Sequence, residues 1–197
     1  MSGPVVIGIG GFASEVGKTT LVCELLRAFP GSEAIKTTRG HYRSCGKDPH
    51  ACCVSHLLGE EPLVRSGRKE TYERGKDTGR YWDAGAVNVH WVIATDEQLG
   101  KGIQQAVARV KSPVVFVEGN SFAEFVNPDC MFMVRRDGDA KIKKSARALV
   151  ARTTPINVTN IYDELPEVVS RVRKIFTGTT ETSKTHLKSD WLLTSKF

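Results

Sequence analysis

The chain has 197 residues, of which 40% are hydrophobic and 25% charged, with 28 basic and 22 acidic side chains. These proportions are those of an ordinary globular domain, and they exclude a collagen, a coiled coil and a wholly disordered chain. The net charge of +6 favours anionic partners such as nucleotides, whereas the scattering of the basic residues argues against nucleic acid. No apolar run approaches the ~20 residues that cross a bilayer, so we expect a soluble, cytoplasmic protein without a membrane partner.

Short apolar segments alternate with longer amphipathic ones along the chain. Strands are predicted at residues 5–9, 34–37, 87–94, 114–117, 131–134 and 155–158. Helices are predicted at residues 19–29, 96–110, 140–151 and 165–176. This alternation is typical of βαβ units, and it predicts a doubly wound, mainly parallel α/β sheet.

Two regions interrupt the alternation. Residues 39–79 are rich in glycine, charge, histidine and cysteine, with one helix predicted from Pro49 to Leu58. An irregular excursion of this length inside a domain is usually functional or mobile. The threonine-, serine- and lysine-rich segment 177–197 is predicted to be a flexible tail. We therefore expect one domain over residues 1–176, with this Cys/His-rich excursion inside it.

The segment between the first predicted strand and helix reads GGFASEVGKTT. Glycines let the backbone bend around a phosphate, and the helix N-terminus directs successive N–H groups at it. Lys18 can reach the β and γ phosphates, and Thr19 can supply a hydroxyl to Mg²⁺. The alternative is a glycine-rich turn with an incidental lysine. The predicted nucleotide-binding residues are Gly11, Ser14, Glu15, Val16, Gly17, Lys18, Thr19 and Thr20.

Glu118 follows the apolar segment 114–117, at the predicted carboxyl end of a strand. Ligands bind at this end of the strands in open α/β sheets, and an acid there can hold a metal-bound water. We therefore expect Glu118 to act with Lys18 in catalysis and with Thr19 in binding Mg²⁺. The alternative is an ordinary surface acid at a strand end.

Four short segments follow one another in a specific order. They are GKTT at 17–20, IK at 35–36 with His41 soon after, GKDT at 75–78 with DAGA at 83–86, and VEG at 117–119. Together they resemble the molybdopterin-guanine dinucleotide biosynthesis protein B (MobB) family of P-loop GTPases, over residues 5–176. Family members have a much shorter segment between IK and GKD, so the resemblance implies that residues 43–74 are a Cys/His-rich insertion.

The MobB resemblance implies a P-loop NTPase fold of the SIMIBI kind that binds GTP and Mg²⁺ and hydrolyses GTP slowly. It implies an accessory role in molybdenum cofactor biosynthesis, beside an enzyme that attaches a guanine nucleotide to molybdopterin. Asp77 would be a catalytic, metal or switch residue. The sequence leaves the oligomeric state open, a homodimer included.

The phosphate loop itself, with five residues between Gly11 and Gly17, is more similar to that of dethiobiotin synthetase. This second resemblance implies an ATP-dependent kinase or ligase in which Lys36 faces the substrate. Arg39 and His41 complete the predicted substrate residues. A third interpretation is a nucleotide-gated metal or cofactor carrier whose delivery surface is the insertion.

Cysteine and histidine side chains cluster in the insertion, at His41, Cys45, His50, Cys52, Cys53 and His56. With five cysteines and no secretory signal, a disulfide framework is not expected. Cys52 and His56 lie four apart on the predicted helix, so with Cys45 they could hold Zn²⁺. The alternative is that the cysteines simply pack as small apolar residues while the histidines are solvated.

Asn160 and Asp163 follow the last predicted strand. In many GTPases an Asn-Lys-x-Asp segment at this place reads guanine through its carboxylate, although Ile161 replaces the lysine here. The alternative is that Asp163 caps the following helix, which leaves GTP and ATP both open. Further candidates for an anionic ligand are Arg39, Arg80, Arg135 and Arg136.

Overall fold

A computed structural model describes residues 3–40, 54–136 and 142–189 of the chain. Its elements are β1 (Val5–Gly11), α1 (Lys18–Ala28), β2 (Glu33–Arg39), η1 (Ser55–Leu57), β3 (Leu63–Ser66), α2 (Arg68–Thr71), α3 (Asp77–Asp83), β4 (Asn88–Ala94), α4 (Leu99–Arg109), β5 (Val114–Glu118), η2 (Ser121–Glu124), β6 (Cys130–Val134), α5 (Lys144–Arg152), β7 (Ile156–Val158) and α6 (Ile161–Ser189). No helix among the described residues combines the length and the apolarity needed to span a membrane.

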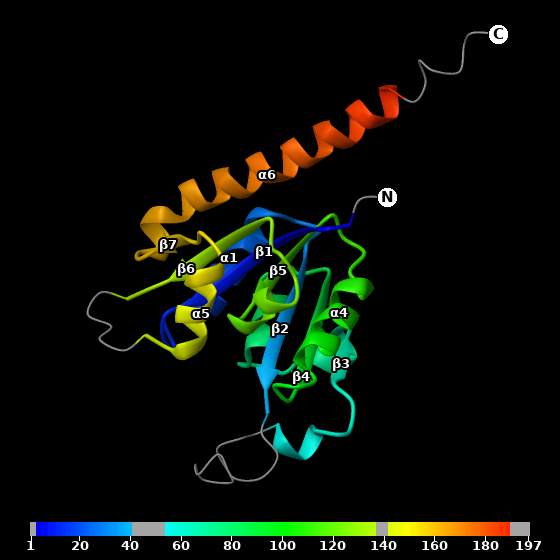
Figure 1. Cartoon of the computed structure of the whole chain (residues 1–197), viewed down its shortest axis with the longest axis vertical. Coiled ribbons are helices and arrows are strands. Elements are labelled where there is room, and N and C mark those ends of the chain that lie inside the picture. Colours follow the sequence, from blue (N-terminus) through cyan, green and yellow to red (C-terminus); the bar gives the residue numbers. More distant parts are fainter. Residues whose placement is uncertain (1–2, 41–53, 137–141, 190–197) are drawn as a thin grey trace, which may run out of the picture.

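Within the described residues the strands form one seven-stranded sheet, in the order β3-β4-β2-β5-β1-β6-β7, with helices on both faces (Figure 1). Every neighbouring pair is parallel except β3 and β4, which are antiparallel at one edge. This confirms the mainly parallel α/β sheet that the alternation of segments predicts.

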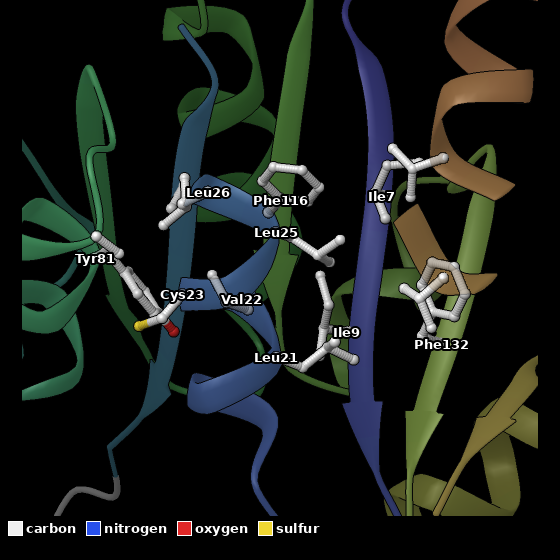
Figure 2. Packing of buried hydrophobic residues seen from close by; sticks show 14 of the residues in the cluster. Ile7, Ile9, Leu21, Val22, Cys23, Leu25, Leu26, Tyr81, Phe116 and Phe132 are labelled. Carbon is white, nitrogen blue, oxygen red and sulfur yellow. The ribbon is translucent and has the colours of Figure 1, made fainter. Parts of the chain in front are cut away.

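Helix α1 packs across the centre of the sheet (Figure 2). Leu21, Leu25 and Leu26 recur at helical spacing and are fully buried together with Ile7 and Phe116. Burying one such side chain contributes roughly 1.5–3 kcal/mol, so this stripe holds α1 firmly on the sheet. The N-terminus of α1 is thereby fixed beside the carboxyl end of β1.

The opposite face of the sheet has its own core, in which Ile103 of α4, Phe122 of η2 and Leu149 of α5 are buried. Strands covered on both faces are apolar at consecutive positions, as β5 is from Val114 to Val117. Such runs are why these strands are recognisable in the sequence.

Part of the predicted insertion belongs to the sheet. The four residues of β3 pair with β4, and α2 and the start of α3 follow within the stretch 39–79 that the sequence treats as irregular. All four β3 residues are half-buried, so they carry no alternating pattern. Of the helix predicted from Pro49 to Leu58, residues 49–53 lie outside the described part, and its end forms the 3₁₀ turn η1.

Helix α6 differs from the prediction at both ends. It begins at Ile161, four residues before the predicted start, and continues to Ser189 through the first half of the predicted flexible tail. Figure 1 shows its C-terminal part extending beyond the sheet.

Candidate functional site

The phosphate loop connects β1 to the first residue of α1. Gly17, the N-cap of α1, has a φ of 106°, a conformation that side chains disfavour, and a Cβ there would lie 2.7 Å from Ile161 Cδ1. Lys18 spans the loop, with Nζ donating to the Ala13 carbonyl at 3.4 Å. Because the first N–H groups of a helix lack intrahelical acceptors, those at the start of α1 could donate to an anion.

Glu118 is the centre of a hydrogen-bond network that includes Thr19, the second residue of α1. It is 3% exposed, and its Oε2 accepts from Thr19 Oγ1 at 2.8 Å and from the Tyr81 hydroxyl. Its Oε1 accepts from Lys36 Nζ at 2.5 Å. The parallel register places Lys36 of β2 directly opposite Glu118 of β5, which explains this contact.

Lys36 also lies 2.5 Å from Asp77 Oδ2, so one ammonium group joins two carboxylates. Burial disfavours its charge, but Glu118 and Asp77 outweigh burial and raise the pKa of Lys36 above its ordinary value. Burial acts against the Asp77 carboxylate in the same way, and Lys36 outweighs it, so the pKa of Asp77 is lowered. Lys36 and Asp77 therefore stay charged at neutral pH.

Lys18 lies in a different electrostatic environment. Burial lowers the pKa of Lys18 below its ordinary value, and the positive charges of Lys143 and Lys36 act in the same direction, against Glu118. Several cations thus lie close together beside the loop. This arrangement favours a bound anion.

Tyr81 of α3 is fully buried beside Cys23 of α1 (Figure 2). Burial and the negative charge of Glu118 raise the pKa of the Tyr81 hydroxyl well above its ordinary value. Tyr81 therefore remains a hydrogen-bond donor to Glu118 at physiological pH.

Lys36 lines three clefts. The first, of about 440 Å³, follows the phosphate loop and is lined by Ser14, Glu15, Gly17, Lys18, Thr19, Thr20, Lys36, Asp77, Arg80, Glu118, Arg136 and Lys143. The second, of about 190 Å³, lies among the end of β2, the start of η2 and the start of α5. The third, of about 550 Å³, includes Thr38, Arg65, Tyr72 and Trp91. Lys36 is therefore accessible from three clefts, each of which could hold part of a ligand.

The oxygen atoms around Thr19 fit the requirements of Mg²⁺. Its hydroxyl donates to Glu118, and the Thr19 side chain also helps to lower the pKa of the nearby Asp77 carboxyl. A hydroxyl and two carboxylates are hard ligands, and Mg²⁺ in phosphate sites adds waters and phosphate oxygens to one or two such groups.

Of the three residues predicted to hold zinc, Cys45 and Cys52 lie outside the described residues, as does the predicted substrate residue His41. His56 lies on η1 and is exposed. In the described ranges, no three histidine, cysteine, aspartate or glutamate side chains are grouped closely enough to hold a metal. Zinc binding stays a prediction.

Asn160 and Asp163 lie at the start of α6, close to the phosphate loop through the contact of Ile161 with Gly17. Asn160 is the capping residue: its Oδ1 faces the Asp163 N–H at 3.4 Å, and Glu164 Oε1 accepts from the Asn160 N–H at 2.8 Å. Asp163 lies inside the first turn, so the alternative in which it caps the helix is wrong. Its role toward guanine stays a prediction.

The chain matches no protein-family model, no curated protein and no solved structure. The geometry of the site brings together Lys18, Thr19, Lys36, Asp77 and Glu118, while Asn160 and Asp163 line none of the three clefts.

Sequence reasoning missed three contributors to the site, namely Tyr81, Lys143 and Asn120. Of these, Asn120 carried a usable signal, since it comes two residues after Glu118.

Proposed function

We propose that this protein binds a nucleoside triphosphate with Mg²⁺ at the N-terminus of α1 and hydrolyses it slowly. The observation that carries the proposal is the convergence of Lys18, Thr19, Lys36, Asp77 and Glu118 from α1, β2, α3 and β5. Packing alone would not gather two lysines and two carboxylates beside a glycine-rich loop, because each buried charge costs free energy.

The roles follow from the chemistry of each group. Lys18 and the N–H groups of the loop would bind the β and γ phosphates. Thr19, Asp77 and Glu118 would hold Mg²⁺, directly or through water, and the ion would neutralise phosphate charge. Arg80 lines the same cleft and would add positive charge beside the phosphates.

The finer assignment is a P-loop NTPase of the SIMIBI kind that binds GTP and assists molybdenum cofactor biosynthesis, beside an enzyme of that pathway. Its support is the MobB resemblance, because Lys18, Lys36, Asp77 and Glu118 each come from one of the four segments that carry it. These four residues share one cleft although they are far apart in the chain.

A second candidate is a nucleotide-dependent kinase or ligase that acts on a small molecule. The clefts of about 190 Å³ and 550 Å³ favour it, since both border Lys36 and leave space for an acceptor beside the phosphate site. Turnover stimulated by a small acceptor would support this candidate. Turnover stimulated only by a protein would support the accessory GTPase.

The deciding experiment is a calorimetric titration of GTP and of ATP, with Mg²⁺, into the wild type and Lys18→Ala. Loss of a charge-assisted contact to phosphate should weaken binding by roughly 10- to 150-fold. Lys101→Ala, at an exposed lysine paired with Glu61, is the matched control and should bind as the wild type does. If Lys18→Ala folds and binds nucleotide as tightly as the wild type, the proposal is wrong.

A further inference from the structure

The cleft of about 190 Å³, here called the basic cleft, shares part of its lining with the phosphate loop's own cleft and has further lining residues of its own. It is lined by Gly11, Ala13, Lys18, Lys36, Thr37, Arg39, Glu118, Gly119, Asn120, Ser121, Lys143 and Ser145. It shares Lys18, Lys36, Glu118 and Lys143 with the phosphate-loop cleft. Arg39, Ser121 and Ser145 line the basic cleft and not the other. Two neighbouring ligands could therefore contact the same lysines.

The charges lining the basic cleft do not balance. Four of its side chains are basic and one, Glu118, is acidic. Glu118 is already bonded to Lys36, which leaves Lys18, Arg39 and Lys143 without an acid in the lining. An anion between these cations would relieve their mutual repulsion.

The ion pair between Arg39 and Asp96 is weak enough for a ligand to take the place of Asp96. Its Nη1 lies 3.0 Å from Asp96 Oδ1, and the two side chains are 43% and 62% exposed. Exposed ion pairs of this kind contribute about 0–1 kcal/mol, so exchange of Asp96 for a ligand oxyanion costs little. Asp96 therefore acts as a weak internal competitor for the same guanidinium.

The hydroxyl groups of the cleft are oriented by the surrounding network. Thr37 Oγ1 donates to the backbone carbonyl of Glu118 at 3.0 Å. Ser145 Oγ accepts from Asn120 Nδ2 at 3.3 Å, which leaves its own O–H to donate. A donor hydroxyl in the same cleft as Lys143 and Arg39 suits an oxyanion with several acceptor atoms.

We propose that the basic cleft binds the oxyanion group of a second, small-molecule substrate while the nucleotide occupies the phosphate loop. This inference rests on the proposed nucleotide binding and names the class of the other substrate, a small phosphorylated or carboxylated compound. Arg39, Lys143 and Ser145 are the residues that recognise it. The shared lysines place that substrate beside the nucleotide's terminal phosphate.

The test fills the phosphate loop first. Protein saturated with Mg²⁺ and a non-hydrolysable β,γ-imido analogue of GTP or ATP is titrated with inorganic phosphate, and in a second arm with acetate, by calorimetry. We expect saturable binding of at least one anion. The anion that binds more tightly shows whether the cleft recognises a phosphate or a carboxylate group. Arg39→Gln should weaken binding of that anion about tenfold, and Asp96→Asn should strengthen it about threefold by releasing Arg39.

The matched controls are Arg27→Gln and Glu24→Gln, because this pair on α1 is also a surface arginine–carboxylate contact, at 2.6 Å. Neither should change anion affinity. The inference is overturned if both anions bind only without the analogue, or if Arg39→Gln binds like the wild type.

Failure of the analogue itself to bind contradicts the proposed function and is recognised separately. In that case the anions are titrated into the protein alone. Weakening in Arg39→Gln then still supports the basic cleft, and unchanged affinity overturns it.

Discussion

The side chain of Asn120 holds both backbone groups of Gly11. Its Oδ1 accepts from the Gly11 N–H at 2.9 Å, and its Nδ2 donates to the Gly11 carbonyl at 3.0 Å. Gly11 ends β1 and begins the phosphate loop, whereas Asn120 follows Glu118 on the neighbouring strand. The loop and the acid that would serve the metal are therefore held at a fixed separation.

Replacing Asn120 by aspartate should loosen the loop, because the variant keeps the size of the side chain but has no N–H to donate. An unpaired buried polar group costs about 1–3 kcal/mol, so we expect a loss of this size in the free energy of unfolding and weaker nucleotide binding. Urea unfolding and calorimetry measure the two effects. Asn157→Asp, at an exposed position of β7, is the control and should change stability by less than about 0.5 kcal/mol. Nucleotide affinity equal to that of the wild type in Asn120→Asp would show that the loop needs no such support.

Lys36→Met should make Mg²⁺ bind more tightly in the absence of nucleotide. Lys36 neutralises Asp77 and Glu118, so its removal leaves two carboxylates that a divalent ion can pair. A tenfold gain in Mg²⁺ affinity would stabilise the fold by about 1.4 kcal/mol at saturation, or roughly 3–5 °C in the unfolding temperature. Scanning calorimetry with and without Mg²⁺ measures this, with Lys101→Met as the control. An equal effect of Mg²⁺ on Lys36→Met and the wild type would remove Asp77 and Glu118 from the metal site.

Asp163→Asn tests whether the start of α6 reads the base. Asn160 Nδ2 lies 2.5 Å from Asp163 Oδ2, and Asp163 does not cap the helix. A carboxylate accepts from the N1–H and amine of guanine, whereas an amide can donate to the xanthine carbonyl. The variant should therefore shift its preference from GTP to xanthosine triphosphate by ~5- to 150-fold. Glu167→Gln, on the same helix, should keep the wild-type ranking; the same ranking in Asp163→Asn would leave GTP and ATP equally plausible.

Glu33→Gln should destabilise the fold and change its response to acid. Glu33 is buried at the start of β2, where Oε2 lies 2.7 Å from His90 Nε2 and Oε1 accepts from the N–H groups of Lys111 and Ser112. Burial raises the pKa of Glu33, but these hydrogen bonds outweigh it and the pKa lies below its ordinary value of 4.5. The ionised carboxylate thus stabilises the fold fully above pH 4.5, and this contribution is lost as the pH falls toward the lowered pKa.

Urea unfolding between pH 3 and pH 7 checks this prediction. At pH 7 the variant should lose about 3 kcal/mol, because it leaves His90 and the two N–H groups with poorer partners. Its stability should also fall less steeply below pH 4.5 than that of the wild type. Glu61→Gln removes an exposed ion pair with Lys101 and should cost less than about 1 kcal/mol. Equal acid slopes in the wild type and Glu33→Gln would contradict the lowered pKa.

Much of the sheet is predictable from local sequence. The strands around Ile7, Val89 and Phe116 are buried on both faces, so their apolar runs are visible without knowledge of their neighbours. The edge strand Leu63–Ser66 is not predictable in this way, because it is four residues long, half-buried and stabilised by its antiparallel pairing with β4.

The residues of the candidate site likewise fall into those that local sequence predicts and those that only tertiary structure brings together. Gly17, Lys18 and Thr19 are consecutive, so a local pattern predicts the loop, and the place of Glu118 at the end of an apolar run makes it a candidate site residue. Tertiary structure alone decided that Lys36 joins Glu118, 82 residues away, and that Asn120 holds Gly11, 109 residues away. These contacts depend on the register of β1, β2 and β5, which is set by packing across the whole sheet and not by any stretch of neighbouring residues.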